Sequence, residues 1–209
     1  VSQMKSDAPF HHDGGVVVAH LGNGASMCAI RGGQSVGSTM GFSALDGLPM
    51  GTRSGQLDPG VVLYMMDQLD MSADEIEHML YRESGLKGLS GISHDMRVLL
   101  ASSDPAAKQA IDYFVFRIRR EIGAMAAILG GLDAVVFTGG IGENGKRIRA
   151  AVCEGLGELG IKLDSDANQR VSGEMEISAE GSNVEIWVIP TNEEIVVAGQ
   201  TQELLKAEA

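Results

Sequence analysis

The sequence has few cysteines, few basic residues and no long apolar run, and each shortage excludes a class of protein. Its only cysteines, Cys28 and Cys153, lie far apart and outside any metal-ligand spacing. We predict that both are reduced core residues of a cytoplasmic protein, one in a strand and one in a helix. The 16 Lys and Arg residues stand against 28 Asp and Glu, and the net charge of −12 argues against nucleic-acid binding. No apolar run reaches the roughly 18 residues that cross a bilayer, and no signal peptide is apparent, so we expect no membrane partner.

Glycine is abundant, with 28 residues and no collagen-like period. These glycines therefore predict turns and close backbone contacts. Hydrophobic residues make up 44% of the chain and charged residues 21%, which is typical of a globular protein with a core. The acidic balance does not exclude anionic ligands, because backbone N–H groups and one or two local arginines can bind phosphate. The chain starts at Val1 rather than Met, and we expect it to be a fragment.

The order of predicted elements indicates a mixed α/β domain of ribonuclease-H-like topology, with a mixed sheet and flanking helices. Three short strands at 14–20, 26–33 and 34–41, joined by glycine turns, predict an antiparallel meander. Helices are expected from Pro59, from the Ser72 cap to residue 85, over about 25 residues after Asp104, and over 144–160. Residues 42–60 and 86–100 are expected to be loops, and two strand–helix units follow, the last ending in a terminal helix.

Three of the predicted strands end in small or polar residues, "HLGNGAS", "FTGGIGEN" and "IPTNEE". Ligands of open α/β sheets collect at the carboxyl ends of strands, where glycine lets backbone amides approach a phosphate. A tight hairpin also requires glycine or asparagine in the first turn, so this turn alone does not distinguish a hairpin from a ligand site. Together with the long glycine-rich loop that carries Arg53, the three turns predict a nucleotide cleft.

At these motifs the sequence resembles a known family. The segment from Val16 to Gly60 resembles the second signature region of the acetate kinases, and "SGISHDMR", "FTGGIGEN" and "VIPTNEE" resemble later segments in the same order. The resemblance covers nearly the whole chain. It implies the actin and hexokinase superfamily fold, with residues 15–209 as the C-terminal, nucleotide-binding domain after a truncated flank of residues 1–14. Members of this family transfer the γ-phosphoryl group of ATP to acetate, giving acetyl phosphate and ADP, with Mg²⁺ (or Mn²⁺).

The resemblance also implies roles for single residues. Arg53 matches the arginine that stabilises the transferring phosphoryl group, and a rigid guanidinium fork suits that role. Glu193 matches the magnesium-linked carboxylate. Nucleotide contacts fall in three segments: one along the phosphates, one that forms a wall of the adenosine pocket, and one around the base and ribose. These residues are, in order, His20, Leu21, Gly22, Asn23 and Gly24; Asp95, Met96 and Arg97; and Gly140, Ile141, Gly142, Glu143 and Asn144.

The sequence departs from the family pattern at two residues. Gln56 stands where aspartate is usual, which removes a charge near Arg53 and leaves the orientation of Arg53 open. Met96 replaces phenylalanine or leucine and should keep the wall apolar. The N-terminal half of the family, with its own lysine, arginine, aspartate and histidine, has no counterpart here. We therefore expect the chain alone to bind ADP or ATP without turning over acetate, and the full-length protein to be a homodimer.

Plainer interpretations exist for the same residues. His20 is compatible with a structural role at a strand end, Arg53 with a solvated loop residue, and Glu193 with a carboxylate favoured by a helix N-terminus. Propionate kinase of the same family remains an alternative, as does a nucleotide-binding module without catalysis. Arg53 and Glu193 argue against the last alternative, because a pure binding module has no need of a transition-state arginine.

Overall fold

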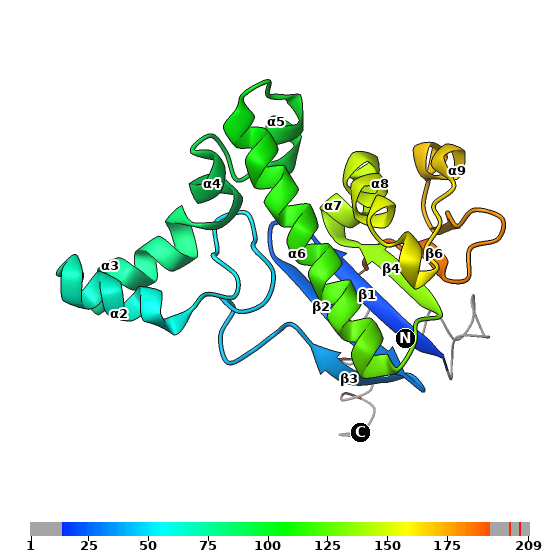
Figure 1. The fold of residues 1–209 in the computed structure, drawn as a ribbon, viewed down its shortest axis with the longest axis horizontal. Coiled ribbons are helices and arrows are strands. Elements are labelled where there is room, and N and C mark those ends of the chain that lie inside the picture. The colour runs from blue at the N-terminus through cyan, green and yellow to red at the C-terminus, as the bar shows by residue number, and fades with distance from the viewer. Residues whose placement is uncertain (1–13, 193–200, 202–204, 206–209) are drawn as a thin grey trace.

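The computed structural model describes residues 14–192 together with Thr201 and Leu205 (Figure 1). Its centre is a six-stranded sheet in the order β3-β2-β1-β4-β6-β5. The first three strands form the predicted antiparallel meander, and β1, β4 and β6 are parallel, which confirms the mixed α/β architecture. The short β5, antiparallel to β6, was not predicted. The strands are β1 Gly15–Leu21, β2 Ala25–Arg31, β3 Gln34–Ser38, β4 Ala134–Thr138, β5 Met175–Glu176 and β6 Glu185–Val188.

Helices pack on one face of this sheet, and α2 and α3 project away from it as an arm (Figure 1). Among the described helices, none has both the length and the apolar character of a membrane span. Glu193, residues 1–13 of the predicted flank, and the predicted terminal helix apart from Thr201 and Leu205 lie outside the described residues. The helices are α2 Pro59–Gln68, α3 Ala73–His78, the π-helical η2 Met79–Glu83, α4 Gly85–Ser90, α5 Met96–Ala101, α6 Pro105–Leu129, α7 Gly139–Asn144, α8 Lys146–Glu154, the 3₁₀-helical η3 Gly157–Leu159 and α9 Ser165–Arg170.

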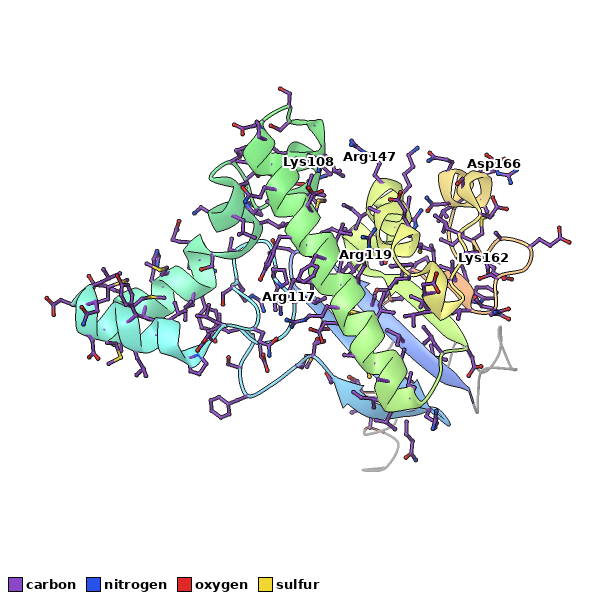
Figure 2. The ribbon with its side chains drawn as sticks, viewed as in Figure 1. Lys108, Arg117, Arg119, Arg147, Lys162 and Asp166 are labelled. Atoms are coloured by element: carbon purple, nitrogen blue, oxygen red, sulfur yellow. The ribbon has the colours of Figure 1, made fainter. Side chains whose placement is uncertain are left out.

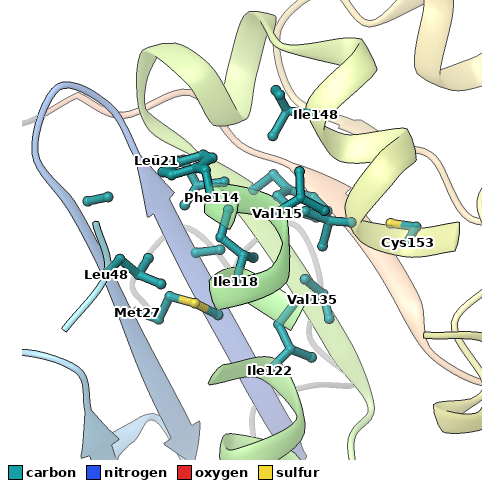
Figure 3. Close-up of a cluster of buried hydrophobic side chains, with 14 of the residues drawn as sticks. Leu21, Met27, Leu48, Phe114, Val115, Ile118, Ile122, Val135, Ile148 and Cys153 are labelled. Carbon is teal, nitrogen blue, oxygen red and sulfur yellow. The ribbon is translucent and has the colours of Figure 1, made fainter. Parts of the chain in front are cut away.

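The long helix α6 spans 25 residues, as its sequence predicts. Asp104 caps its start by accepting a hydrogen bond from the Ala106 amide at 2.8 Å. At its end Gly130 adopts the left-handed conformation with φ of 64°, which glycine reaches without steric cost. The helix lies across the sheet, and Phe114, Ile118 and Ile122, each fully buried, pack with strand side chains into the core (Figure 3).

The predicted helix over 72–85 is wrong in its second half. The capping box of Ser72 and Glu75 starts α3 as expected, but the helix widens into the π-helical η2 after His78. The reason lies in the backbone, because two carbonyls of η2 accept hydrogen bonds from the loop of residues 42–58. The Leu80 carbonyl accepts from the Ser54 amide at 3.1 Å, and the Tyr81 carbonyl accepts from Thr52 Oγ1 at 2.8 Å.

Residues 86–100 are not the expected loop, because they form most of α4 and α5. Leu86 and Leu99, each 1% exposed, anchor these short helices to the core. Gly91, with φ of 65°, ends α4, and Asp95 caps α5 by accepting from the Arg97 amide at 2.8 Å. Burial therefore outweighs the weak helix propensity of this glycine- and serine-rich segment.

Two further expectations need correction. The "GGIGEN" segment, expected as a turn, is the helix α7, which Gly139 enters with φ of 77°. The helix expected over 144–160 is shorter, with α8 ending at Glu154 before the separate turn η3. Of the two free cysteines, Cys153 is a core residue as predicted, whereas Cys28 is only partly buried and donates to Ser35 Oγ at 3.1 Å.

The strand register sets the ends of β1 and β4 side by side. His20 pairs with Ser26 across the hairpin and with Thr138 on β4. The turn after β1 therefore lies beside α7, which follows β4 directly. Phe137 is in turn paired with Val188 on β6, so three carboxyl-terminal ends share one edge of the sheet, where ligands of such sheets collect.

Candidate active site

The hairpin turn of residues 22–24 is both a tight turn and a point of close approach. The Gly22 amide donates to the Gly24 carbonyl at 3.0 Å, closing the turn. The Asn23 carbonyl accepts from the Gly51 amide at 3.0 Å, which brings the long loop onto the turn. A Cβ on Gly24 would lie 3.3 Å from Arg53 Nη2, and a Cβ on Gly51 would lie 2.2 Å from Asn23 Oδ1. Small residues are thus required because two backbone segments and a guanidinium meet here.

Backbone hydrogen bonds hold the part of the loop that carries Arg53 against the start of α4. The Met50 carbonyl accepts from the Leu86 amide at 2.8 Å, and the Thr52 carbonyl accepts from the Ser84 amide at 3.0 Å. The Met50 amide donates to the Arg53 carbonyl at 3.0 Å. Arg53 therefore projects from a segment whose backbone is fixed on both sides.

The guanidinium of Arg53 is partly exposed and forms no ion pair within the described part of the chain. Its Nη1 donates to the Ala44 carbonyl at 2.9 Å. Among the described residues, no partner accepts from its Nε or Nη2. One edge of the fork is therefore anchored while the other is available to an anion such as a phosphoryl group.

One cleft, of about 520 Å³, joins three segments that are remote in the sequence. We call it the α7 cleft. Residues 22–23 from the hairpin turn, 94–97 at the start of α5 and 140–145 in and after α7 form its walls. Met96, Leu100 and Ile141 give it an apolar lining. The α7 cleft is lined by Gly22, Asn23, His94, Asp95, Met96, Arg97, Leu100, Gly140, Ile141, Asn144 and Gly145.

A second cleft, of about 490 Å³, lies on the Arg53 side of the hairpin turn. We call it the Arg53 cleft. It shares Gly22 and Asn23 with the α7 cleft, so the two clefts adjoin at the turn. The Arg53 cleft is lined by His20, Gly22, Asn23, Gly24, Ala25, Ser26, Met40, Gly41, Phe42, Ser43, Ala44, Asp46, Met50 and Arg53.

Asp95 and Arg97 form an ion pair at the mouth of the α7 cleft. Arg97 Nη2 lies 2.6 Å from Asp95 Oδ2, and the Arg97 side chain is 90% exposed. Hydrogen bonds from the side chain and the backbone amide of Arg97 lower the pKa of Asp95 to about 2. Asp95 is therefore ionised at neutral pH, where it both caps α5 and holds Arg97 at the edge of the cleft.

Three residues expected at the nucleotide line neither cleft. Leu21 is fully buried in the core, and Gly142 is buried where a Cβ would lie 3.3 Å from the Phe137 carbonyl carbon. Glu143 Oε1 accepts from the Gly139 amide at 3.0 Å and from the Thr191 amide at 2.9 Å. The Glu143 carboxylate thus ties the start of α7 to the segment after β6.

Other lining residues were not anticipated. His94, Leu100 and Gly145 belong to the α7 cleft, and residues 40–44 with Asp46 belong to the Arg53 cleft. The length of the glycine-rich loop was the available signal for the second group, since long loops in compact domains are usually functional. His94 and Leu100 carried no such signal, because His94 lies just before the unpredicted helix α5 and Leu100 lies within it.

The side-chain hydrogen bonds of Gln56 do not involve Arg53. Gln56 Oε1 instead accepts from Arg120 Nη2 at 2.5 Å and from Arg117 Nη2 at 3.4 Å, both on α6. The replacement of the family's usual aspartate by Gln56 therefore affects how the loop is attached to α6. The orientation of Arg53 is set by its bond to the Ala44 carbonyl.

A larger cleft of about 1070 Å³ lies between the start of α6 and α8, and it contains none of the predicted site residues. Lys108 on α6 and Arg147 on α8 stand on its two sides (Figure 2). Lys108 pairs with Asp112, and Arg147 Nη1 donates to the Leu100 carbonyl at 3.0 Å. These two cations are thus engaged by neighbouring protein groups, which makes this cleft a weaker candidate than the pair at the hairpin turn.

The fold and the two adjoining clefts define an α/β domain with a candidate ligand site at the carboxyl edge of its parallel strands. A model described as the acetokinase family matches residues 7–199, so the chain belongs to the acetokinase family. The acetate kinase of Methylocella silvestris is 61% identical over 205 residues, which are 98% of this chain and 50% of that protein. The chain thus spans about half the length of the curated relatives it matches.

Solved structures agree with this membership. The acetate kinase of Porphyromonas gingivalis has a TM-score of 0.91 at 36% identity, over 98% of this chain and 52% of that one. A propionate kinase from Francisella tularensis has a TM-score of 0.87 at 40% identity, over 94% and 51%. An acetate kinase structure and a propionate kinase structure therefore both match this chain over nearly its whole length.

Proposed function

We propose that this chain is the nucleotide-binding half of an acetate kinase, an enzyme that transfers the γ-phosphoryl group of ATP to acetate and releases acetyl phosphate and ADP. One observation carries the proposal. Three remote segments form one cleft, and that cleft adjoins a second one containing Arg53 through the shared residues Gly22 and Asn23. A nucleotide with its base in the α7 cleft and its phosphates along the turn would point its outer phosphate at Arg53.

The chemistry of each cleft fits the part of the nucleotide assigned to it. Met96, Leu100 and Ile141 offer apolar contact to a purine ring. The hairpin turn presents glycine backbone, which phosphate can approach closely. Arg53 has an Nε and an Nη2 that no described residue engages, and these donors suit the equatorial oxygens of a phosphoryl group in transfer.

The described residues suit a divalent cation that is held mainly by the nucleotide rather than by protein side chains. No group of three metal-ligating side chains occurs among residues 14–192, and Asp46 is the one described carboxylate that lines the Arg53 cleft. Mg²⁺ commonly uses one or two carboxylates together with phosphate oxygens and waters. When bound with ATP, Mg²⁺ neutralises phosphate charge. We propose that Glu193, which lies outside the described residues, is the protein carboxylate linked to this Mg²⁺.

The rival function is a module that binds nucleotide without catalysis. The two functions differ in what Arg53 does, since a binding module would use it only for affinity. The partial freedom of the guanidinium, with one edge bonded to Ala44 and the other open, favours catalysis. We prefer acetate to propionate as the acyl substrate because the curated relatives at about 60% identity are acetate kinases.

The test is Arg53→Ala in the full-length protein. We expect kcat for acetyl phosphate formation to fall on the order of 10³-fold, while the Kd for ADP changes only a fewfold. Arg31→Ala is the matched control, because Arg31 is exposed at the opposite end of β2 from the turn. A variant with near-normal kcat and weakened ADP binding would instead support the binding module.

We further propose that the full-length protein is a cytoplasmic homodimer. The exposed apolar side chains Leu63, Tyr64 and Met66 on α2 offer a surface that a second copy could bury. Light scattering of the full-length protein would report the oligomeric state, and a monomer at micromolar concentration would contradict the dimer.

A further inference from the structure

Arg149 on α8 is a buried cation without an acidic partner among the described residues. The residue is 1% exposed and is the largest of the fully buried side chains. Burial lowers its pKa. A buried guanidinium is costly unless its N–H groups are satisfied, so its partners show what it does.

Every partner of Arg149 is an oxygen of α7 or of Asn168. Nη1 donates to the Gly142 carbonyl at 2.8 Å and to the Glu143 carbonyl at 2.7 Å. Nε donates to Asn168 Oδ1 at 2.8 Å, and Nη2 donates to the Asn168 carbonyl at 3.0 Å. Asn168 Nδ2 donates onward to the Lys146 carbonyl at 3.0 Å. The guanidinium therefore joins α7, α8 and α9 through a buried polar network.

The two carbonyls belong to the last turn of α7, where a helix carries partial negative charge. At the opposite end, Glu143 Oε1 receives the Gly139 amide. Between these two attachments α7 presents Gly140, Ile141 and Asn144 to the α7 cleft. Arg149 lines neither cleft, and it contacts α7 through two carbonyls of residues that do not line the α7 cleft.

We propose that Arg149 is a positioning residue that holds α7 in the place where it receives the adenosine part of the nucleotide, an inference that rests on the proposed function. The fork geometry is essential, since one flat guanidinium serves both α7 carbonyls and Asn168 at once. A lysine ammonium at this site has no equivalent geometry. Nucleotide affinity, rather than the phosphoryl-transfer step, is the property that depends on Arg149.

Arg119 offers a matched comparison on the neighbouring helix. It lies on α6 facing α8 (Figure 2). Arg119 Nε donates to the Val152 carbonyl at 3.2 Å, and Nη2 donates to the Ala151 carbonyl. Arg119 thus makes the same kind of contact, from guanidinium to the carbonyls near a helix end, without touching α7 or either cleft. A purely structural arginine should behave like Arg119.

The test compares Arg149→Lys with Arg119→Lys in the full-length enzyme. We expect Arg149→Lys to weaken ADP binding and raise the KM for ATP about tenfold, the size that loss of a charge-assisted hydrogen bond would give. Its kcat at saturating ATP should stay within about threefold, and its KM for acetate should not change. Hydrogen exchange of the amides at 139–145 should accelerate in the nucleotide-free protein. Arg119→Lys should lower the melting temperature with the ATP KM and this exchange unchanged.

The outcomes separate the two proposals. If the wild-type enzyme does not bind ADP, the proposed function falls and this inference falls with it. If the wild type binds ADP and Arg149→Lys binds it equally well, or if both lysine variants weaken ADP alike, this inference alone is overturned. Should Arg149→Lys fail to fold, Asn168→Ala keeps the guanidinium and removes one support, and a rise in ATP KM without a fall in kcat is again expected. An unchanged KM there would overturn the inference.

Discussion

At the scale of single residues, Arg117 on α6 is the side chain that ties the Arg53 loop to the core. It is 3% exposed, and its Nη2 donates to the Gly47 carbonyl at 3.0 Å. Nη1 donates to the Tyr113 hydroxyl at 2.9 Å, while Nε is buried without a hydrogen-bond partner. Arg117 thus holds the loop that presents Arg53 through two acceptors, the backbone carbonyl of Gly47 and the neutral side chain of Gln56.

The neutral side chain of Gln56 is the weak point of this attachment. Its oxygen accepts from both Arg117 and Arg120, so Gln56→Glu would convert these contacts into charge-assisted ones. We expect a gain of roughly 0.5–1 kcal/mol, limited because Gln56 and Arg120 are exposed. Thermal unfolding should show an increase of about 1–4 °C, smaller at high salt. Gln109→Glu, also exposed but at the start of α6, is the control, and an equal response of the two variants would contradict the prediction.

The sequence predicts some of these residues and not others, for a physical reason. The glycines of the hairpin turn and the loop that carries Arg53 are visible because local backbone geometry demands them. Arg149, Arg117 and Glu143 act on groups in other elements, up to 70 residues away for Arg117 and Gly47. No local pattern encodes which distant carbonyl a side chain will meet, so these roles appear only in the folded structure.

At the scale of elements, α4 can support the Arg53 loop only because it begins with glycine. Gly85 has φ of 61°, and a Cβ there would lie 2.2 Å from the Met50 carbonyl oxygen and 2.7 Å from that of Arg53. The close contact lets the Leu86 amide reach the Met50 carbonyl at 2.8 Å. The start of α4 and the loop are therefore fitted to each other through backbone.

We predict that Gly85→Ala damages both stability and catalysis. The methyl group must displace the loop as well as adopt a strained φ, and we expect a loss of more than about 2 kcal/mol together with a lower kcat in the full-length enzyme. Gly91→Ala is the matched control, since Gly91 has φ of 65° but open space around the position of its Cβ. It should cost only about 1 kcal/mol with normal kcat. Equal effects of the two substitutions, measured by chemical unfolding and steady-state kinetics, would contradict the argument.

Elements with strong local signals were predicted well, and short ones were not. The proline start, aspartate cap and terminal glycine of α6 gave its 25 residues correctly. By contrast, α4, α5 and α7 have six residues each, in stretches rich in glycine or serine. Such helices depend on buried anchors such as Leu86 and Leu99 and on contacts with other elements, which sequence periodicity does not report.

At the scale of the whole molecule, the described residues that line the α7 cleft and the Arg53 cleft all lie between residues 20 and 145. Most of the core that supports them, α6 against the sheet, also lies within the chain. Nucleotide binding should therefore survive in the 209-residue chain, whereas phosphoryl transfer to acetate is expected to require the lysine, arginine, aspartate and histidine that the resemblance places in the N-terminal half of the family.

We predict that the 209-residue chain binds ADP and forms no acetyl phosphate. Isothermal titration with ADP should give measurable heat, and a hydroxamate assay with ATP and acetate should remain at background. The full-length enzyme, run under the same conditions, is the control for both measurements. Acetyl phosphate formed by the chain alone, or no heat with ADP while the full-length enzyme binds it, would contradict this prediction.

The general architecture was within reach of sequence reasoning, because glycine turns separate the strands of the meander and two strand–helix units follow. The joining of the clefts was not, since it depends on the parallel register of His20 with Thr138. That register brings the turn after β1 beside α7, and no one-dimensional pattern specifies which strands become neighbours.

The hairpin turn that both clefts share acts as a partition between two compartments. On the proposed function, a bare nucleoside would fill the first compartment and leave the guanidinium beyond the partition untouched. Only a nucleotide with a phosphate chain long enough to pass the hairpin turn would occupy both the α7 cleft and the Arg53 cleft. The width of the hairpin turn of residues 22–24 would then make binding in both clefts depend on the number of phosphates that the ligand carries.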